Sequence, residues 1–258
     1  MTGAWRLAGP RGRHVAAYWG GLGLLTWDVF RNAWLPRRYL RLIVAECDGM
    51  GVRSLIVAMT AAIFTGMVFA LQSSVYLSRF GADLYVGPLV GLSVLRELGP
   101  VLTAILVGGK VASGITAELG SMKVTEQIDA LRAIGVNHVK RLIVPRVLAA
   151  FFVFPLLTSL ADFVALFGGM LVAVYERRID VYLYWSTIFY WVVIRDLVTG
   201  VGKSFFFGVI VTLIGAYNGL AMTGGTEGLG RATTATVVQV SLAVIIADFF
   251  LTKLFLLL

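Results

Sequence analysis

The chain has 258 residues, of which 59% are hydrophobic and 14% are charged, whereas an ordinary soluble domain has about 25% charged residues. Its formal net charge is +8, but the basic residues flank apolar runs and form no stripe with interleaved aromatic residues, which argues against nucleic-acid binding. Its one cysteine, Cys47, excludes an internal disulfide. The apolar runs leave no room for a separate soluble domain, so we expect a single all-α integral membrane domain.

In the predicted organisation, residues 1–53 form an N-terminal region and residues 54–258 form the transmembrane domain. The first region holds eight arginines and three acidic residues, so by the positive-inside rule we expect it in the cytoplasm. It shows no cleavable signal peptide. Trp19, Trp27, Phe30 and Trp34 recur at helical intervals in a segment too short to span. This predicts an interfacial helix that ends near residues 36–38, and a poorly packed tail is the alternative.

Five membrane-spanning helices are expected in chain order: Ser54–Ser78, Leu89–Thr116, Val147–Val174, Asp196–Leu220 and Ala232–Leu256. Residues 118–146 and 223–230 then form inner loops, and residues 79–88 form an outer loop. Aromatic residues are concentrated in residues 181–195, which predicts an outer interfacial segment. Two full spans within residues 181–222 are the alternative and would invert everything that follows. An odd number of spans places the C-terminus outside.

Two charged residues, Arg96 and Glu97, lie inside the second predicted span. A charge at the bilayer centre costs about 2.5–3.5 kcal/mol on insertion scales, so the pair indicates a wet or protein-lined cavity. Pro100 has no N–H group, so the carbonyl of Arg96 loses its usual partner, and we expect a break in the helix. The alternative is a purely structural ion pair between helices.

Successive residues lie about 100° apart on a helix, so Arg96 and Glu97 each need a partner elsewhere. Six residues in or near spans are candidates: Lys110, Asp162, Arg195, Asp196, Lys203 and Asp248. Lys203 is also consistent with a snorkelling side chain. We predict a shared cavity that is lined by Arg96, Glu97 and Lys203 together with the lipid-facing residues Gln72 and Tyr76 of the first span.

The run from Thr199 to Ser204 looks like the end of a phosphate-binding loop, but Leu197 stands where the first glycine is required. We therefore expect no nucleotide cofactor in this chain. His14 and His138 have no metal-like spacing, and no serine or cysteine is arranged for nucleophilic work. The sequence predicts no catalytic residue and no metal ligand. The small-residue pair Gly215 and Gly219 predicts close helix packing in the fourth span, either within the chain or across a dimer.

Three long motifs carry a resemblance. They are Leu95-Arg96-Glu97-Leu98-Gly99-Pro100-Val101-Leu102-Thr103-Ala104, the run from Ala117 to Leu131, and Glu227-Gly228-Leu229-Gly230-Arg231-Ala232-Thr233-Thr234 followed by Asp248 and Leu251-Thr252. With these motifs, residues 40–258 resemble the MlaE/YrbE permease family. The pair Gly109-Lys110 departs from the expected pattern only in having lysine in place of arginine.

The resemblance implies a multi-pass permease of the bacterial inner membrane that works as a dimer, expected here to be a homodimer. It also implies a cytoplasmic ABC ATPase dimer, a partner with an MCE domain, and phospholipid or related lipid as substrate. Transport would connect the inner membrane with the cell envelope or outer membrane and so bear on outer-membrane asymmetry. The alternatives are a non-transporting membrane scaffold and an intramembrane lipid-modifying enzyme.

Residues 118–135 are predicted to form the coupling helix that docks into the ATPase. An apolar stripe recurs at helical spacing through Val124, Ile128, Leu131 and Ile134, and Gly135 is a C-terminal stop. The residues expected to couple to the ATPase are Glu118, Lys123, Glu126, Asp129 and Arg132. A helix resting on the inner leaflet is the alternative, but mixed charge signs favour a protein partner.

Overall fold

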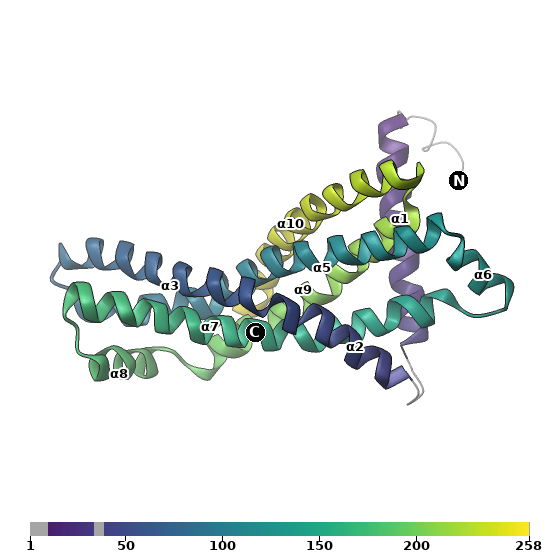
Figure 1. The fold of residues 1–258 in the computed structure, drawn as a ribbon. Coiled ribbons are helices and arrows are strands. Elements are labelled where there is room, and N and C mark those ends of the chain that lie inside the picture. The colour runs from purple at the N-terminus through teal and green to yellow at the C-terminus, as the bar shows by residue number, and fades with distance from the viewer. Residues whose placement is uncertain (1–9, 34–38, 258) are drawn as a thin grey trace.

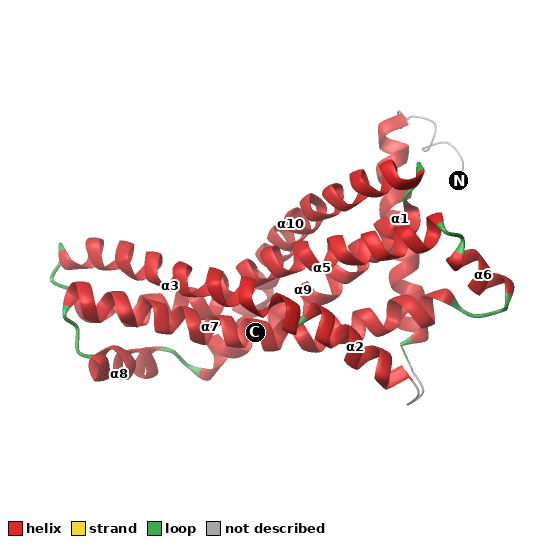
Figure 2. Cartoon of the chain, in the orientation of Figure 1, coloured by secondary structure: helices red, strands yellow, loops and turns green. Residues whose placement is uncertain are grey.

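A computed structural model describes residues 10–33 and 39–257, and within these ranges the chain forms helices and no strand (Figure 2). Within the described residues, five helical segments are long and apolar enough to cross a membrane: Leu40–Ser78, Asp83–Val124, Val139–Arg177, Ile194–Ala221 and Gly225–Leu257. The chain is therefore an all-α integral membrane protein with five candidate spans, as the sequence predicts.

Helix α1 (Pro10–Asn32) crosses the bundle in Figure 1 and packs against α9 (Ile194–Ala221) and a π-helical turn, Val139–Ile143. Leu25 and Val29 are buried on its inner side, whereas Trp19, Trp27 and Phe30 are exposed. This division of faces is what an interfacial helix requires. The described helix ends at Asn32, and Trp34 and the predicted end at residues 36–38 lie outside the described residues.

The first two spans begin or end beyond their predicted bounds. Helix α2 (Leu40–Met50) packs against α7 (Val144–Arg177) and leads through a 3₁₀ turn (Val52–Ser54) into α3 (Leu55–Ser78). The second span starts with a 3₁₀ turn (Asp83–Tyr85) and α4 (Val86–Ser93). It continues through a π-helical turn (Val94–Leu98) into α5 (Gly99–Val124). It runs past Thr116 because the polar side chains of its last turns have protein partners: Glu118 pairs with Arg146, and Lys123 donates to the carbonyls of Leu220 and Met222.

The third span is α7 (Val144–Arg177), and the segment that connects it to α5 has only short non-helical breaks. The short helix α6 (Gln127–Ala133) and the π-helical turn before α7 lie between them. The predicted inner loop of residues 118–146 is therefore mostly helical.

Helix α8 (Val181–Trp191) is separate from α9, as predicted for residues 181–195. Its 11 residues extend only about 16 Å, roughly half of the hydrocarbon core. The alternative of two full spans in this region is excluded. Asp180 begins α8 by accepting hydrogen bonds from the backbone N–H groups of Tyr182 and Leu183.

The last span, α10 (Gly225–Leu257), starts earlier than predicted. The chain turns within Met222–Gly224, and the expected Gly-rich loop of residues 223–230 is largely the first turns of α10. Gly224 and Gly225 have φ angles of +92° and +63°, which favour glycine.

Helix α5 is central, with α7, α9 and α10 packed against it, while α3 and α7 lie side by side and carry α8 at one end (Figure 1). Gly215 and Gly219 face α5, and a Cβ atom at these positions would lie 2.8 Å from the carbonyl oxygen of Ala112 and 3.1 Å from that of Thr116. The predicted close approach of the fourth span is confirmed.

Candidate functional site: an intramembrane charge cluster

The candidate site is built on the π-helical turn Val94–Leu98, immediately before Pro100. A break was predicted here, and the structure corrects it: the helix continues but widens for one turn, with the N–H of Gly99 bonded to the carbonyl of Val94. The carbonyl of Arg96 accepts a hydrogen bond from Lys203 Nζ at 3.1 Å, so a side chain of α9 takes the place of the missing backbone donor. Gly200 allows this approach, because a Cβ atom there would collide with the carbonyl oxygen of Leu95.

Lys203 is fully buried and joins three helices. Its ammonium lies 2.7 Å from Glu97 Oε2, 3.0 Å from Asp248 Oδ1 and 2.7 Å from Thr252 Oγ1. The snorkelling interpretation is therefore wrong, since the ammonium points into the protein and not toward the headgroups. A lysine at this depth is stable only because two carboxylates and two neutral oxygens surround it.

Arg96 pairs with a different acid. Its Nε lies 2.8 Å from Asp196 Oδ1, and Asp196 is 4% exposed. The other oxygen of Asp196 accepts a hydrogen bond from the N–H of Val193 at 3.0 Å, so this acid also caps the start of α9. As helical geometry requires, Arg96 and Glu97 do not pair with each other.

The cluster thus contains two cations and three carboxylates, with a formal net charge of −1. Three of the six predicted candidates, Asp196, Lys203 and Asp248, belong to it. Lys110 instead donates to the backbone carbonyl of Arg53, and Arg195 donates to that of Phe255.

A cavity of about 270 Å³ opens directly onto this cluster. Arg96 and Glu97 line it and are 38% and 41% exposed, so the paired charges keep one side accessible. Its remaining walls are both polar and apolar, formed by Leu92, Ser93, Thr199, Thr252, Phe255 and Leu256. This combination can accept a charged headgroup beside apolar chain atoms. Sequence reasoning gave Thr199 and Thr252 no role in this cavity, although both lie one helical turn from a cluster residue.

Gln72 and Tyr76 lie elsewhere, exposed on α3, and do not line this cavity within the single chain. Their assignment to a shared lipid cavity stays a prediction.

Asp162 lies apart from the cluster, in the middle of α7. It is 1% exposed, and neither carboxylate oxygen has a hydrogen-bond partner among the described residues. Oδ1 occupies the space where the Cβ atom of a side chain at position 99 would lie, next to Gly99. The glycine of the Arg96–Pro100 motif therefore provides room for this carboxyl group.

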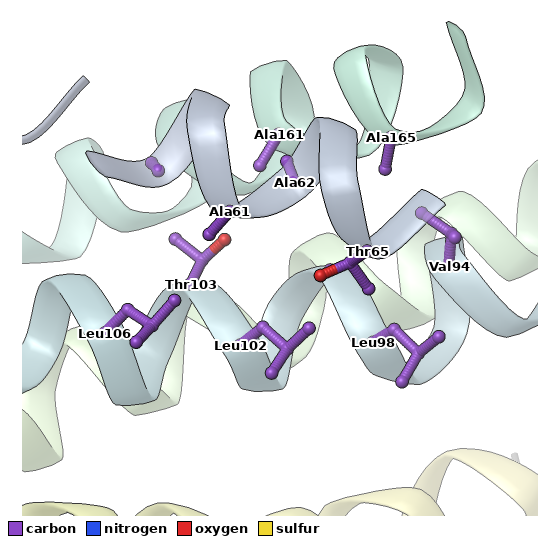
Figure 3. Close-up of a pocket in the computed structure, with 12 residues that line it drawn as sticks. Ala61, Ala62, Thr65, Val94, Leu98, Leu102, Thr103, Leu106, Ala161 and Ala165 are labelled. Atoms are coloured by element: carbon purple, nitrogen blue, oxygen red, sulfur yellow. The ribbon is translucent and has the colours of Figure 1, made fainter. Parts of the chain in front are cut away.

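A second cavity lies between α3, α5 and α7 close to Gly99 (Figure 3). Its volume is about 20 Å³, which is room for about one water molecule. Apart from the hydroxyls of Thr65 and Thr103, its side chains are apolar. It is too small for lipid, so the larger cavity at Arg96 and Glu97 is the better candidate site.

The predicted coupling helix is two helices, which corrects the single helix expected over residues 118–135. Glu118 and Lys123 belong to α5, and the chain then turns at Glu126, which has a φ angle of +58°. Asp129 and Arg132 lie on α6, and Arg132 Nη1 is 3.1 Å from Asp129 Oδ1.

Helix α6 ends in a Schellman motif, which confirms Gly135 as the stop. The N–H of Gly135 bonds to the carbonyl of Arg132, and the N–H of Val136 bonds to that of Leu131. Arg132 Nη2 lies 3.3 Å from His138 Nε2. Burial, with Arg132 adding to it, lowers the pKa of His138. The neutral ring can therefore accept this contact at neutral pH.

Two of the predicted coupling residues hold the fold together. Lys123 Nζ donates to the carbonyls of Leu220 and Met222 at 2.7 and 2.8 Å and so binds the end of α9. Glu118 Oε1 lies 2.6 Å from Nη2 of Arg146, whose side chain is 3% exposed. Nε of the same arginine lies 3.2 Å from Glu46 Oε1. Glu126, Asp129 and Arg132 remain exposed.

The predicted apolar stripe is divided by the same turn. Ile128 is buried, whereas Val124 is 42% and Ile134 is 73% exposed. The exposed members of the stripe therefore remain available to a partner.

Comparison with known proteins gives a consistent result. Residues 43–254 match the family described as "Permease MlaE", and this range contains every residue of the charge cluster. The chain is 40% identical over 221 residues to the "Intermembrane phospholipid transport system permease protein MlaE" of Haemophilus influenzae, with 84% of each chain covered. It is 37% identical over 236 residues to a "Probable ABC transporter permease protein" of Rickettsia felis, covering 92% of this chain and 91% of that one. It is 33% identical over 243 residues to "Protein TRIGALACTOSYLDIACYLGLYCEROL 1, chloroplastic" of Arabidopsis thaliana, covering 92% of this chain and 68% of that protein.

Proposed function

Because the chain belongs to the MlaE permease family, we propose that it is the membrane-spanning subunit of an ABC transporter that moves phospholipids between the inner membrane and the cell envelope or outer membrane. In this proposal it works as a homodimer in the bacterial inner membrane. ATP is hydrolysed by a separate cytoplasmic ATPase dimer, and an MCE-domain protein continues the path of the lipid. The chain itself supplies the lipid site and the surface that couples it to the ATPase.

The observation that carries the proposal is the charge cluster that is open to a cavity at membrane depth. Buried charges that serve only structure are best sealed from solvent, as Lys203 is, whereas Arg96 and Glu97 are both more than one-third exposed. A group of charges that remains accessible inside a membrane is typical of a substrate path.

The mixed signs of the cluster fit a phospholipid headgroup. The Arg96 guanidinium presents N–H donors suited to a phosphate, and the Glu97 carboxylate attracts a headgroup amine. Phe255 and Leu256, on the same cavity, provide apolar contact for the start of the acyl chains. Arg96 is already paired with Asp196, and Glu97 is already paired with Lys203. A headgroup would therefore bind by competing with these ion pairs.

The exposed part of α6 is the proposed coupling surface. Glu126, Asp129 and Arg132 carry both charge signs on a projecting segment between two spans (Figure 1). A folded partner can pair both signs, whereas an anionic leaflet attracts mainly basic residues.

A transfer assay tests the proposal. The permease is reconstituted with its ATPase in proteoliposomes, and ATP-dependent phospholipid transfer is compared between the native chain and Glu97→Lys. We expect transfer to be abolished while the ATPase still co-purifies, because the substitution places a second cation against Lys203 and removes the accessible carboxylate. Glu176→Lys, at the exposed end of α7, is the control and should transfer lipid normally. Normal transfer by Glu97→Lys would contradict the proposal.

A further inference from the structure

A groove separate from the charge cluster lies where α1 meets α9 and α10. Its volume is about 460 Å³, within the range of ligand sites. The walls are almost entirely apolar or aromatic: Tyr18, Trp19 and Leu22 come from α1, Ile214 from α9, and Leu242 and Ile246 from α10. Gln239 is the one amide side chain that lines it.

Two hydrogen bonds to its side-chain oxygen fix the orientation of the Gln239 amide. Oε1 accepts hydrogen bonds from Tyr18 Oη at 3.0 Å and from Asn218 Nδ2 at 2.7 Å. Asn218 also donates to Thr236, whose hydroxyl lies 3.0 Å from that of Thr116. This chain of polar groups connects four helices, so the amide is part of the packed structure and not a mobile surface side chain.

The amide nitrogen of Gln239 has no acceptor among the described residues. Both donors bond to the oxygen of Gln239, so they leave the two N–H bonds of Nε2 unused, and Gln239 is one of the residues that line the groove. A polar N–H group facing a hydrocarbon environment costs free energy unless an acceptor reaches it. The groove therefore needs a ligand with a hydrogen-bond acceptor next to apolar chain atoms.

The depth of the groove identifies that acceptor. Helix α1 crosses the bundle (Figure 1), so its contacts with α9 and the hydrogen bond of Tyr18 to Gln239 of α10 lie near one depth. Trp19 and Trp27 are exposed along it, and tryptophan concentrates at the membrane interface. Tyr217 of α9 packs against Gly21 of α1, and its ring centroid lies 5.0 Å from that of Tyr18. These contacts fix the depth of α1 relative to α9. Just below the headgroups, the acceptors that a phospholipid offers are its ester carbonyls.

The groove is not an extension of the cavity at Arg96 and Glu97. Gln239 and Asp248 are nine residues apart on α10, which is two and a half turns, so they face opposite sides of the helix. A lipid in the groove therefore contacts the face of α10 that points away from the charge cluster.

We propose that the groove between α1, α9 and α10 binds one diester glycerophospholipid, with an ester carbonyl accepting a hydrogen bond from Gln239 Nε2 and an acyl chain lying against Leu22, Leu242 and Ile246. The headgroup extends toward the interface beside Trp19. The site is selective for the ester region of the lipid and not for headgroup charge, since the part of the groove that the structure describes presents no ionised side chain.

Photo-cross-linking in proteoliposomes tests this site with the full chain. The probes are phosphatidylethanolamine with a diazirine in one acyl chain and the matching diether lipid, which has the same chains and headgroup but no ester carbonyls. Adducts are located by peptide mass spectrometry. We expect adducts on Leu22, Leu242 and Ile246, with about five- to tenfold higher yield for the diester lipid, which is the effect of one well-placed hydrogen bond.

Three variants complete the experiment. Gln239→Glu keeps an oxygen for Tyr18 and Asn218 but removes the amide donor, so the preference for diester lipid should disappear. Ala243→Trp fills the groove and should abolish these adducts, whereas Ala235→Trp, on an exposed part of α10 outside the groove, should not change them. Adducts near Phe255, in the cavity at Arg96, should persist in all variants, so failure of this site is distinguishable from failure of the transport proposal.

Three results would overturn the inference. Equal yields for diester and diether lipid in the native chain would exclude recognition of the ester. Adducts spread equally over Ile245 and Ile246 would indicate ordinary contact with the bilayer. Cross-links from the groove to a second copy of the chain, without lipid adducts, would show that protein occupies it.

Discussion

Lys203 is the residue on which the charge cluster depends. It is the only cation within 4 Å of Glu97 and Asp248 in the described structure, and it also holds the free carbonyl of Arg96. Removing one partner of a buried ion pair leaves an uncompensated charge and costs about 3–5 kcal/mol. We expect Lys203→Met to lose roughly this much stability, measured as thermal unfolding in detergent, whereas Lys253→Met, exposed on α10, should unfold like the native chain. Equal unfolding temperatures for the two variants would show that the ion pairs of Lys203 contribute little to stability.

Gly99 and Asp162 form a second, tightly packed contact at the residue scale. Because a Cβ atom at position 99 would overlap Asp162 Oδ1, we expect Gly99→Ala to destabilise the permease by about 1–3 kcal/mol through overpacking. The double variant Gly99→Ala/Asp162→Ala should recover most of the loss, because it removes the carboxyl group that clashes. Thermal unfolding of the single and double variants measures the coupling. Purely additive effects would contradict the contact.

At the scale of elements, the separation of α8 from α9 could be predicted because aromatic clustering and length are local properties of residues 181–222. The π-helical turn could not be predicted. Pro100 shows that a backbone donor is missing, but whether the helix breaks or widens depends on Lys203, about 100 residues later. The turn at Glu126 was also missed, since glutamate has no preference for positive φ and the contacts of Lys123 with the end of α9 are tertiary.

Helix α6 gives a prediction at the same scale. Replacing Glu126 and Asp129 with lysine should weaken co-purification of the ATPase and lower lipid-stimulated ATP hydrolysis, because both acids are exposed on the proposed coupling surface. Binding to anionic vesicles should become stronger in the same variant, since the segment becomes more basic. Exposed charge pairs contribute about 0.2–1 kcal/mol each, so the expected loss of affinity is several-fold and not complete. If the ATPase is recovered at native yield and hydrolysis is unchanged, the coupling surface lies elsewhere.

For the whole molecule, the five candidate spans of the described residues predict that the two ends of the chain lie on opposite sides of the membrane. The arginine-rich first region predicts a cytoplasmic N-terminus and therefore a periplasmic C-terminus. Tags at the two ends, tested with a membrane-impermeant label on intact spheroplasts, should show an accessible C-terminus and a protected N-terminus. Both tags on the same side would require an even number of crossings.

In our proposal, the cavity beside Arg96 and Glu97 holds the transported lipid. A cryo-EM structure of the permease with its ATPase in phospholipid nanodiscs tests this directly. We predict elongated density in this cavity, with a headgroup within hydrogen-bond distance of Arg96 or Glu97 and chains against Phe255 and Leu256. A cavity closed by protein side chains, with lipid density confined to the outer surface of the bundle, would contradict it.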